Sequence, residues 1–214
     1  MAEIPYHLLK DPLVFGKALW PGVDFYDKQV EVIHSVRDNA ETFVVAGHQL
    51  GKDFVSGFLA LWFFLTRHPV RIVTTSVKDD HLRVLWGEIG RFIDTAQVPL
   101  DAKRGGPLII RHRELRKLVG PMGNREVCKI SYCVGMVSEK GEGMAGHHAT
   151  HTLAIIDEGS GAEDTVYERL TTWARRILVI GNSYPSGGNF FEKGIEAGDV
   201  VLPDHVVETN GKAT

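Results

Sequence analysis

Two short segments far apart in the chain carry side chains suited to phosphate chemistry. The first follows an apolar run and precedes a helical pattern; it comprises Ala46, Gly47, His48, Gln49, Leu50, Gly51, Lys52 and Asp53. A loop at such a point presents free backbone N–H groups and the positive end of a helix dipole, which favour an anion. The second is an apolar run that ends in Asp157 and Glu158. Together the two segments indicate a site that hydrolyses a nucleoside triphosphate.

Lys52 is the residue expected to contact the phosphates. It follows Gly51 at the start of a helix, so its ammonium can reach the β- and γ-phosphates while the glycine lets the backbone approach closely. A loop of this kind usually has Ser or Thr after the lysine as a magnesium ligand, whereas this chain has Asp53. The Asp53 carboxylate can bind Mg²⁺ directly or through a water. The alternative is that the segment only caps a buried helix.

The acidic pair and a later asparagine are expected to act at the same site. Asp157 would hold hydrated magnesium, and Glu158 would accept a proton from the attacking water. The alternative for this pair is a cap on the next helix, helped by Ser160. Asn182 ends the next strand pattern, and its amide can both donate and accept, which suits sensing the γ-phosphate or fixing the water. A turn-forming asparagine before a proline-containing loop is the alternative for Asn182.

Tyr26 and Gln29 lie one expected helix before the phosphate loop. The Gln29 amide can read the two hydrogen-bonding edges of adenine, and the ring of Tyr26 or Phe25 can stack on the base. Ordinary packing at a helix start is the alternative. The two residues therefore complete a predicted ATP site.

Composition bounds the class of protein. The chain has 214 residues, of which 43% are hydrophobic and 24% charged, which suits one globular domain with a sizeable core. The net charge is −3, so any DNA contact would have to use a local basic patch. Cys128 and Cys133 match no zinc spacing and are expected to be buried thiols. The N-terminus lacks a signal-peptide pattern, and the longest apolar stretch, 58–65, is too short to cross a bilayer.

Short apolar runs alternate with helical patterns along the chain. The expected strands are 42–46, 70–75, 127–134, 152–157 and 177–181, and the expected helices are 26–37, 51–66, 78–94 and 163–174. A hairpin or insertion is expected within 99–125, and one edge strand at 205–208. This alternation predicts an α/β fold with a parallel sheet covered on both faces. Ligands of such sheets bind at the carboxyl ends of the strands, where the motifs described above fall.

Two further clusters invite a functional interpretation. His147, His148 and His151 precede the acidic strand, but no cysteine or carboxylate pattern completes a zinc site, so a switch loop over 141–151 is expected instead. A basic run then stands within 111–117. It is interpreted as solvated surface, with a phosphate contact or an arginine supplied to a neighbouring subunit as the functional option.

Several of these segments resemble one known family. They are the stretch 26–29, the loop 48–52, the stretches 74–76 and 86–89, the stretch 142–147 ahead of 153–158, and Gly181-Asn182 followed by 187–191. The pattern over roughly residues 24–195 is similar to the ATPase domain of the large terminase subunit, the motor that packages bacteriophage DNA. The resemblance implies a RecA-like P-loop NTPase fold of the ASCE type, with a mostly parallel central sheet and helices on both faces.

The resemblance also implies an activity and partners. The chain would couple Mg²⁺-dependent ATP hydrolysis to translocation of double-stranded DNA into a procapsid, with Asn182 in the device that couples hydrolysis to domain movement. Expected partners are double-stranded DNA, the portal protein, the small terminase subunit and further copies in a ring on the portal. The expected location is the host cytoplasm, with no membrane association and no retention in the mature virion.

The family usually has an arginine where His48 stands. The missing charge would come from Arg104, Arg111 or Arg125, in this subunit or an adjacent one, and weak activity of the isolated domain is expected. The expected division is an N-terminal arm (1–24), the ATPase domain (25–197) and a tail or linker (198–214) toward an absent nuclease domain, so no nuclease activity is expected. A helicase-like translocating ATPase and a nucleotide-binding module with weak hydrolysis are the alternatives.

Overall fold

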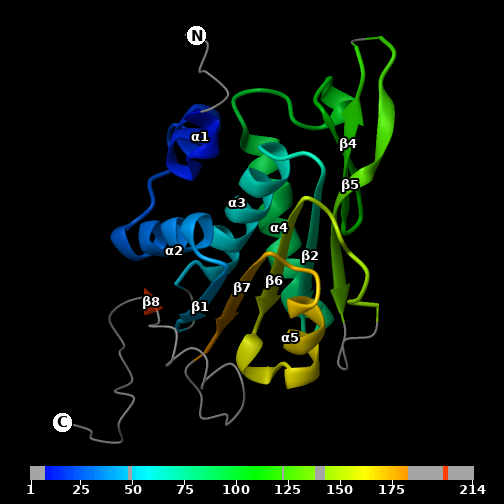
Figure 1. Ribbon diagram of the computed structural model, residues 1–214. Helices are drawn as coiled ribbons and strands as arrows, with labels where there is room; N and C mark the ends of the chain where they lie inside the picture. Colours follow the sequence, from blue (N-terminus) through cyan, green and yellow to red (C-terminus); the bar gives the residue numbers. More distant parts are fainter. Residues whose placement is uncertain (1–7, 48–49, 122, 138–142, 183–199, 202–214) are drawn as a thin grey trace, which may run out of the picture.

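The computed structural model describes residues 8–47, 50–121, 123–137, 143–182 and 200–201. Within this part, one sheet of eight strands has the order β3-β4-β5-β2-β6-β7-β1-β8 (Figure 1). The strands are β1 (Glu41–Val45), β2 (Val70–Ser76), β3 (Leu108–Arg111), β4 (Glu114–Val119), β5 (Glu126–Val137), β6 (His151–Asp157), β7 (Arg176–Gly181) and β8 (Val200–Val201). The α-helices are α1 (Pro12–Leu19), α2 (Asp27–Asp38), α3 (Lys52–Leu65), α4 (Asp79–Thr95) and α5 (Asp164–Thr171).

The sheet is mostly parallel, as the alternation of apolar runs and helices predicts. Strands β5, β2, β6, β7, β1 and β8 pair in parallel, whereas β3 and β4 form a hairpin that pairs antiparallel with β5. The hairpin lies within the predicted insertion 99–125. Strand β5 runs beyond the expected 127–134 because it pairs with β4 at its start and with β2 at its end, while α5 is shorter than the expected 163–174. The edge strand expected at 205–208 lies outside the described residues.

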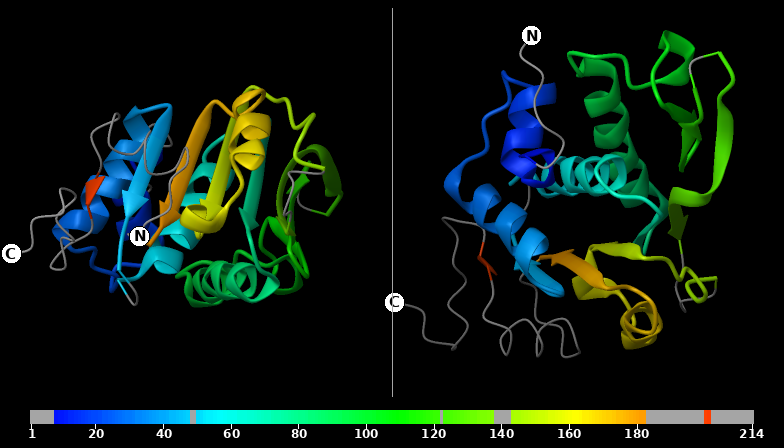
Figure 2. Two further views of the ribbon diagram at one scale, coloured as in Figure 1. Left: turned by 90° about the horizontal axis from the view of Figure 1, so that it is seen from below. Right: turned by 45° about the horizontal axis from the view of Figure 1, so that its top comes forward.

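Helices cover both faces of the sheet (Figure 2). Successive side chains of a strand point to opposite faces. Ile72, Leu153 and Ile155 accordingly join the core formed with α1 to α4, whereas Val73 and Ile156 join the core formed with α5. This two-sided burial explains why the central strands are apolar along their whole length. It confirms the predicted fold class.

Helix α3 is apolar nearly all round because other elements surround it. Phe58 is fully buried, and its ring contacts those of Phe15, Trp20, Phe25 and Phe92. These rings come from α1, the segment after it, and α4. The helix that leads away from the predicted phosphate loop is thus fixed by the core, so its first residues have a defined position.

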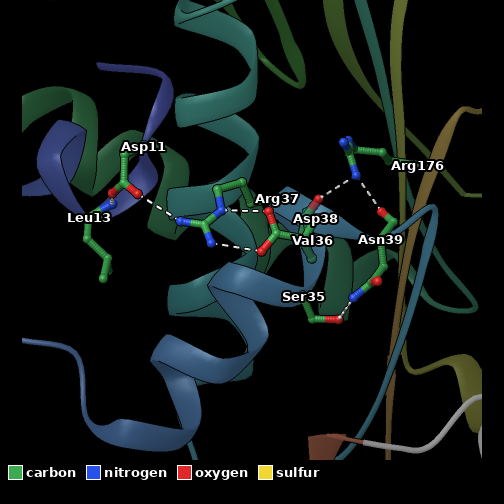
Figure 3. A network of polar contacts seen from close by, with 8 residues as sticks. All are labelled: Asp11, Leu13, Ser35, Val36, Arg37, Asp38, Asn39 and Arg176. Atoms are coloured by element: carbon green, nitrogen blue, oxygen red, sulfur yellow. Dashed lines mark hydrogen bonds and ion pairs between the residues drawn. The ribbon is translucent and has the colours of Figure 1, made fainter. Parts of the chain in front are cut away.

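The N-terminal segment is joined to the core by polar contacts as well (Figure 3). Asp11 caps α1 by accepting from the backbone N–H groups of Leu13 (2.9 Å) and Val14 (3.1 Å). Arg37 donates to the same carboxylate at 2.8 Å, and it pairs through two further bonds with Asp38. The segment expected to be an N-terminal arm therefore contains a capped helix that packs on α2 and α3. The division into arm, ATPase domain and tail remains a prediction.

Candidate functional site

The candidate residues follow the carboxyl ends of three adjacent strands. Strands β6, β7 and β1 lie side by side; β6 ends at Asp157, Asn182 follows β7, and β1 leads into the loop before α3. The N–H of Ala46 donates to the carbonyl of Gly181 at 2.9 Å, which holds the start of that loop against the end of β7. The topology therefore gathers residues from distant parts of the sequence at one edge of the sheet.

Three side chains at this edge bond to one another. Lys52 Nζ donates to Asn182 Oδ1 at 2.7 Å and to Glu158 Oε1 at 3.2 Å. Asn182 Nδ2 donates to Glu158 Oε2 at 3.2 Å, which closes the ring of contacts. Lys52 is only 7% exposed. We refer to Lys52, Glu158 and Asn182 as the triad; each of its members is a predicted site residue.

The backbone of Glu158 is unusual. It has φ 54° and ψ 44°, and among the described residues other than glycine only His112 shares a positive φ. This left-handed conformation is uncommon for a residue with a side chain, and such residues cluster at functional sites. Glu158 precedes a short 3-10 turn but makes no side-chain capping bond to it. Helix capping therefore does not account for the direction of its carboxylate, whereas the contact with Lys52 does.

Negative charge is concentrated beside the triad. Asp157 is 5% exposed, and burial, followed by the nearby carboxylates of Asp53 and Glu158, raises its pKa to about 7 although Lys52 opposes the shift. Burial is also the main cause that raises the pKa of Asp53. The Lys52 ammonium therefore faces the carboxyl groups of Asp53, Asp157 and Glu158. A divalent cation would offset the negative charge that Lys52 does not balance.

The donor set fits magnesium. Mg²⁺ prefers oxygen ligands and is usually held by one or two carboxylates together with substrate phosphates, rather than by a cage made only of protein. Asp157 and Asp53 supply such carboxylates at the edge where Lys52 lies. In the part of the chain that the structure describes, no three His, Cys, Asp or Glu side chains form a metal site by themselves.

The end of the phosphate loop requires glycine. Gly51 has φ 75°, and a β-carbon there would lie 2.8 Å from Gln29 Nε2. Gln29 is 5% exposed, and Tyr26 Oη donates to the carbonyl of Leu50 at 2.8 Å. Gln29 in α2 and Tyr26 just before it thus contact the loop and support it. This packing role is close to the alternative given for the two residues, and their contact with adenine stays a prediction. His48 and Gln49 lie outside the described residues, and Gly47 directly precedes them.

The end of β2 lies beside the acidic strand. The stretch 74–76 belongs to the family resemblance, but the sequence did not assign a role to its side chains. Ser76 is the register partner of Asp157, so their side chains share the face that α3 and α4 cover. Within the described part, the hydroxyls of Ser76 and Thr75 are buried and have no hydrogen-bond partner. His81, at the start of α4, lies 3.8 Å from Glu158 Oε1. The only signal for this group in the sequence was a strand that ends in polar residues. That signal was weak because the sequence did not show that β2 lies beside β6.

His48 stands where the family usually has an arginine, and three other arginines were expected to supply its charge. These arginines lie toward the other end of the sheet. Arg104 bonds to Asp94 at 2.9 Å, and Arg125 donates to the carbonyls of Gly105 and Gly106. Arg111 is exposed at the end of β3, on the far side of β4, β5 and β2 from the triad. A role of any of them in a neighbouring subunit remains a prediction.

Arg113 and Lys117 of the basic run, and His147 of the histidines, have structural partners. Arg113 makes two bonds to Asp79, at 2.6 and 2.7 Å, and Lys117 donates to the carbonyl of Arg67. His147 Nδ1 lies 2.7 Å from Tyr132 Oη, and its Nε2 lies 3.1 Å from the carbonyl of Gly143. His148 and His151 line surface hollows. Cys128 and Cys133 are buried free thiols, as predicted.

Comparison with known proteins gives structural matches only. No protein-family model matches the chain, and no curated protein sequence matches it. Among solved structures, a point mutant of the large terminase ATPase domain of Thermus phage P74-26 has a TM-score of 0.63 and 18% identity, over 83% of this chain and 72% of that one. The HK97 bacteriophage large terminase has a TM-score of 0.60 and 14% identity, over 96% of this chain and 45% of that one.

A third match was solved with a nucleotide. This large terminase, from a thermophilic bacteriophage and in complex with ADP, has a TM-score of 0.52 and 16% identity, over 83% of this chain and 44% of that one. The chain thus matches less than half of the HK97 protein and of the ADP-bound protein. The fold is that of phage large terminase ATPase domains, as the sequence resemblance implies. None of the described helices has the length and apolar character needed to cross a membrane.

Proposed function

We propose that the chain is an ATP-hydrolysing motor domain that drives packaging of double-stranded DNA. The observation that carries the proposal is the triad: a lysine at a helix start, a glutamate after the acidic strand and an asparagine after the next strand meet beside the buried carboxyl group of Asp157 and the half-buried one of Asp53. The likeness in fold to terminase ATPase domains, one of them solved with ADP, supports the same conclusion.

Lys52 and the start of α3 would bind the phosphates of ATP. The first backbone N–H groups of a helix have no partner within it, so they can donate to phosphate oxygens together with the Lys52 ammonium. Lys52 now donates to Glu158 and Asn182. Binding of the triphosphate would draw Lys52 toward the phosphate oxygens and release both partners for their own roles.

Asp157 and Asp53 would hold magnesium, which offsets negative charge on the phosphates when it is bound. Ser76 adds a buried hydroxyl beside Asp157, and this hydroxyl can bond to a water in the magnesium shell. A loop of this kind usually has a Ser or Thr hydroxyl after the lysine, where this chain has Asp53. The Ser76 hydroxyl at the end of β2 would supply that kind of group instead. The acidic loop residue and the polar strand end would thus act together.

Glu158 would act as the general base. Its carboxylate is held by Asn182 Nδ2, so the asparagine can fix its orientation and report the phosphate state to the segment that follows. That segment, 183–191, lies outside the described residues, and its coupling role is part of the proposal. The proposal also includes the expected partners, which are double-stranded DNA, the portal protein, the small terminase subunit and further copies in a ring. The proposed location is the host cytoplasm.

Two substitutions at the triad test the site. Lys52→Ala should abolish ATP binding, whereas Glu158→Gln should keep binding and lower Mg²⁺-dependent phosphate release by about 10²–10⁴-fold. Lys103→Ala removes an exposed lysine in the short turn before β3, far from the triad, and should change neither quantity. Equal phosphate release in all four proteins, the wild type included, would refute hydrolysis at this site and favour a nucleotide-binding module.

The kind of motor needs a separate measurement. A packaging ATPase should be stimulated by procapsids that carry a portal. Stimulation by single-stranded DNA alone would instead support a helicase-like translocating ATPase.

A further inference from the structure

The edge of the sheet opposite the triad carries two adjoining hollows. One, of about 510 Å³, lies where β6 and β7 begin and where α3 leads into β2, and Arg67, His151, Arg175 and Arg176 line it. The other, of about 610 Å³, continues past the start of β6 toward the end of α5. Thr150 and Arg175 line both, so the two hollows adjoin at these residues. We call the two together the amino-edge hollow.

The amino-edge hollow has an excess of positive charge. Three guanidinium groups line it against one carboxylate, that of Asp38. Asp38 already bonds twice to Arg37, at 2.7 and 2.8 Å, outside the hollow. Burial, and then the charges of Arg67, Arg175, Lys10 and Lys117, lower the pKa of His151. The charged groups among these causes are all cationic, in agreement with the excess of guanidinium groups.

Packing positions the Arg67 guanidinium, and a backbone bond fixes the point from which Arg175 extends. The Arg67 guanidinium lies 4.1 Å from the ring centroids of both Trp62 and Phe63. The backbone N–H of Arg175 donates to Thr152 Oγ1 at 2.8 Å, which fixes the chain where the Arg175 side chain, exposed on the surface, begins. Less side-chain entropy is lost on binding when a group such as the Arg67 guanidinium is already positioned.

We propose that the amino-edge hollow binds the phosphodiester backbone of double-stranded DNA through Arg67, Arg175 and the hydroxyl of Thr150. Guanidinium groups match phosphate oxygens in geometry and charge, and hydroxyls and backbone groups commonly complete such contacts. Because the net charge of the chain is −3, a contact with DNA must depend on a local basic surface of this kind.

This inference rests on the proposed function only for the choice of double-stranded DNA as the ligand. The hollow lies at the amino ends of the strands, whereas the triad lies at their carboxyl ends. Changes at one should therefore leave the other intact.

The test measures fluorescence anisotropy of a labelled DNA duplex without nucleotide, over a series of salt concentrations. Arg175→Glu and Thr150→Glu change exposed residues and should each weaken binding about tenfold or more, because a charge-assisted contact is lost and a repulsion is added. The slope of log K against log salt should fall by about one for Arg175→Glu. Arg83→Glu makes the same charge change on α4, where the side chain is 72% exposed, and should weaken binding at least threefold less.

Three outcomes would overturn the inference. The first is unchanged DNA affinity in both variants at the hollow. The second is an equal loss in Arg83→Glu or in Arg111→Glu on the hairpin, which would indicate a general charge effect or a different surface. The third is binding of inorganic phosphate that depends on Arg175 while DNA affinity does not. Lys52→Ala should bind DNA normally and lose ATP, so failure of the proposed function is recognised separately.

Discussion

Replacement of Asp157 by asparagine should stabilise the nucleotide-free protein while it impairs the site. The carboxyl group is 5% exposed and lies near two other carboxyl groups, which together with burial raise its pKa from 3.8 to about 7. Between these two pH values the folded state holds the proton more tightly than the unfolded state, so stability falls as the pH rises. The asparagine would be neutral at every pH, and its amide oxygen can still accept the bond that the Glu158 backbone N–H donates to this side chain.

The size of the effect follows from the same two pKa values. At 1.36 kcal/mol per pH unit, ionisation of Asp157 costs the folded state about 4 kcal/mol at pH 7.5 and little at pH 4. Because neighbouring side chains can relax toward the ionised carboxylate, Asp157→Asn should raise the free energy of unfolding by about 2–4 kcal/mol at pH 7.5 and by under about 1 kcal/mol at pH 4.

Urea denaturation in EDTA at several pH values measures this difference. Asp80→Asn is the matched control, because the Asp80 side chain is 86% exposed on α4, and it should change stability little. Addition of ADP and Mg²⁺ at about 100 times Kd should stabilise the wild type by about 2.7 kcal/mol and Asp157→Asn by less. A gain from Asp157→Asn that does not depend on pH, or a loss at pH 7.5, would refute the electrostatic reasoning.

Three further substitutions test the parts around the site. Ser76→Ala should raise the Mg²⁺ concentration needed for nucleotide binding about tenfold, because a partner of the metal's outer shell is lost. Thr75→Val, on the α5 face, should leave that concentration unchanged. Titration of Mg²⁺ against a fluorescent nucleotide compares the two variants, and equal curves would exclude a role for Ser76. Gly135→Ala places a β-carbon 2.3 Å from Trp86 Nε1 and should cost about 1–3 kcal/mol by urea denaturation, so an unchanged midpoint would contradict the packing. Gly51→Ala should lower the free energy of unfolding by about 1–2 kcal/mol, because φ is 75° at this position. A midpoint of thermal unfolding equal to that of the wild type would count against backbone strain at Gly51.

The sequence by itself determined the class of fold and the types of residue at the site. Apolar runs that alternate with helical patterns predict a parallel sheet, and the loop before α3 and the acidic end of β6 each carry a local signal of phosphate chemistry. These signals are readable because they depend on neighbours in the chain: a strand, a turn and a helix start follow one another directly. The buried thiols and the hairpin were predictable for the same reason.

The tertiary structure decided which of these groups meet. The bonds from Lys52 to Glu158 and Asn182 depend on the adjacency of β6, β7 and β1, and the neighbourhood of Ser76 and Asp157 depends on β2 lying beside β6. The amino-edge hollow likewise joins Arg67 to Arg175, which no local pattern connects. Strand order is set by the packing of the whole core, and the pKa of Asp157 is set by burial and by charges brought near through that order. Neither is encoded in any short stretch of sequence.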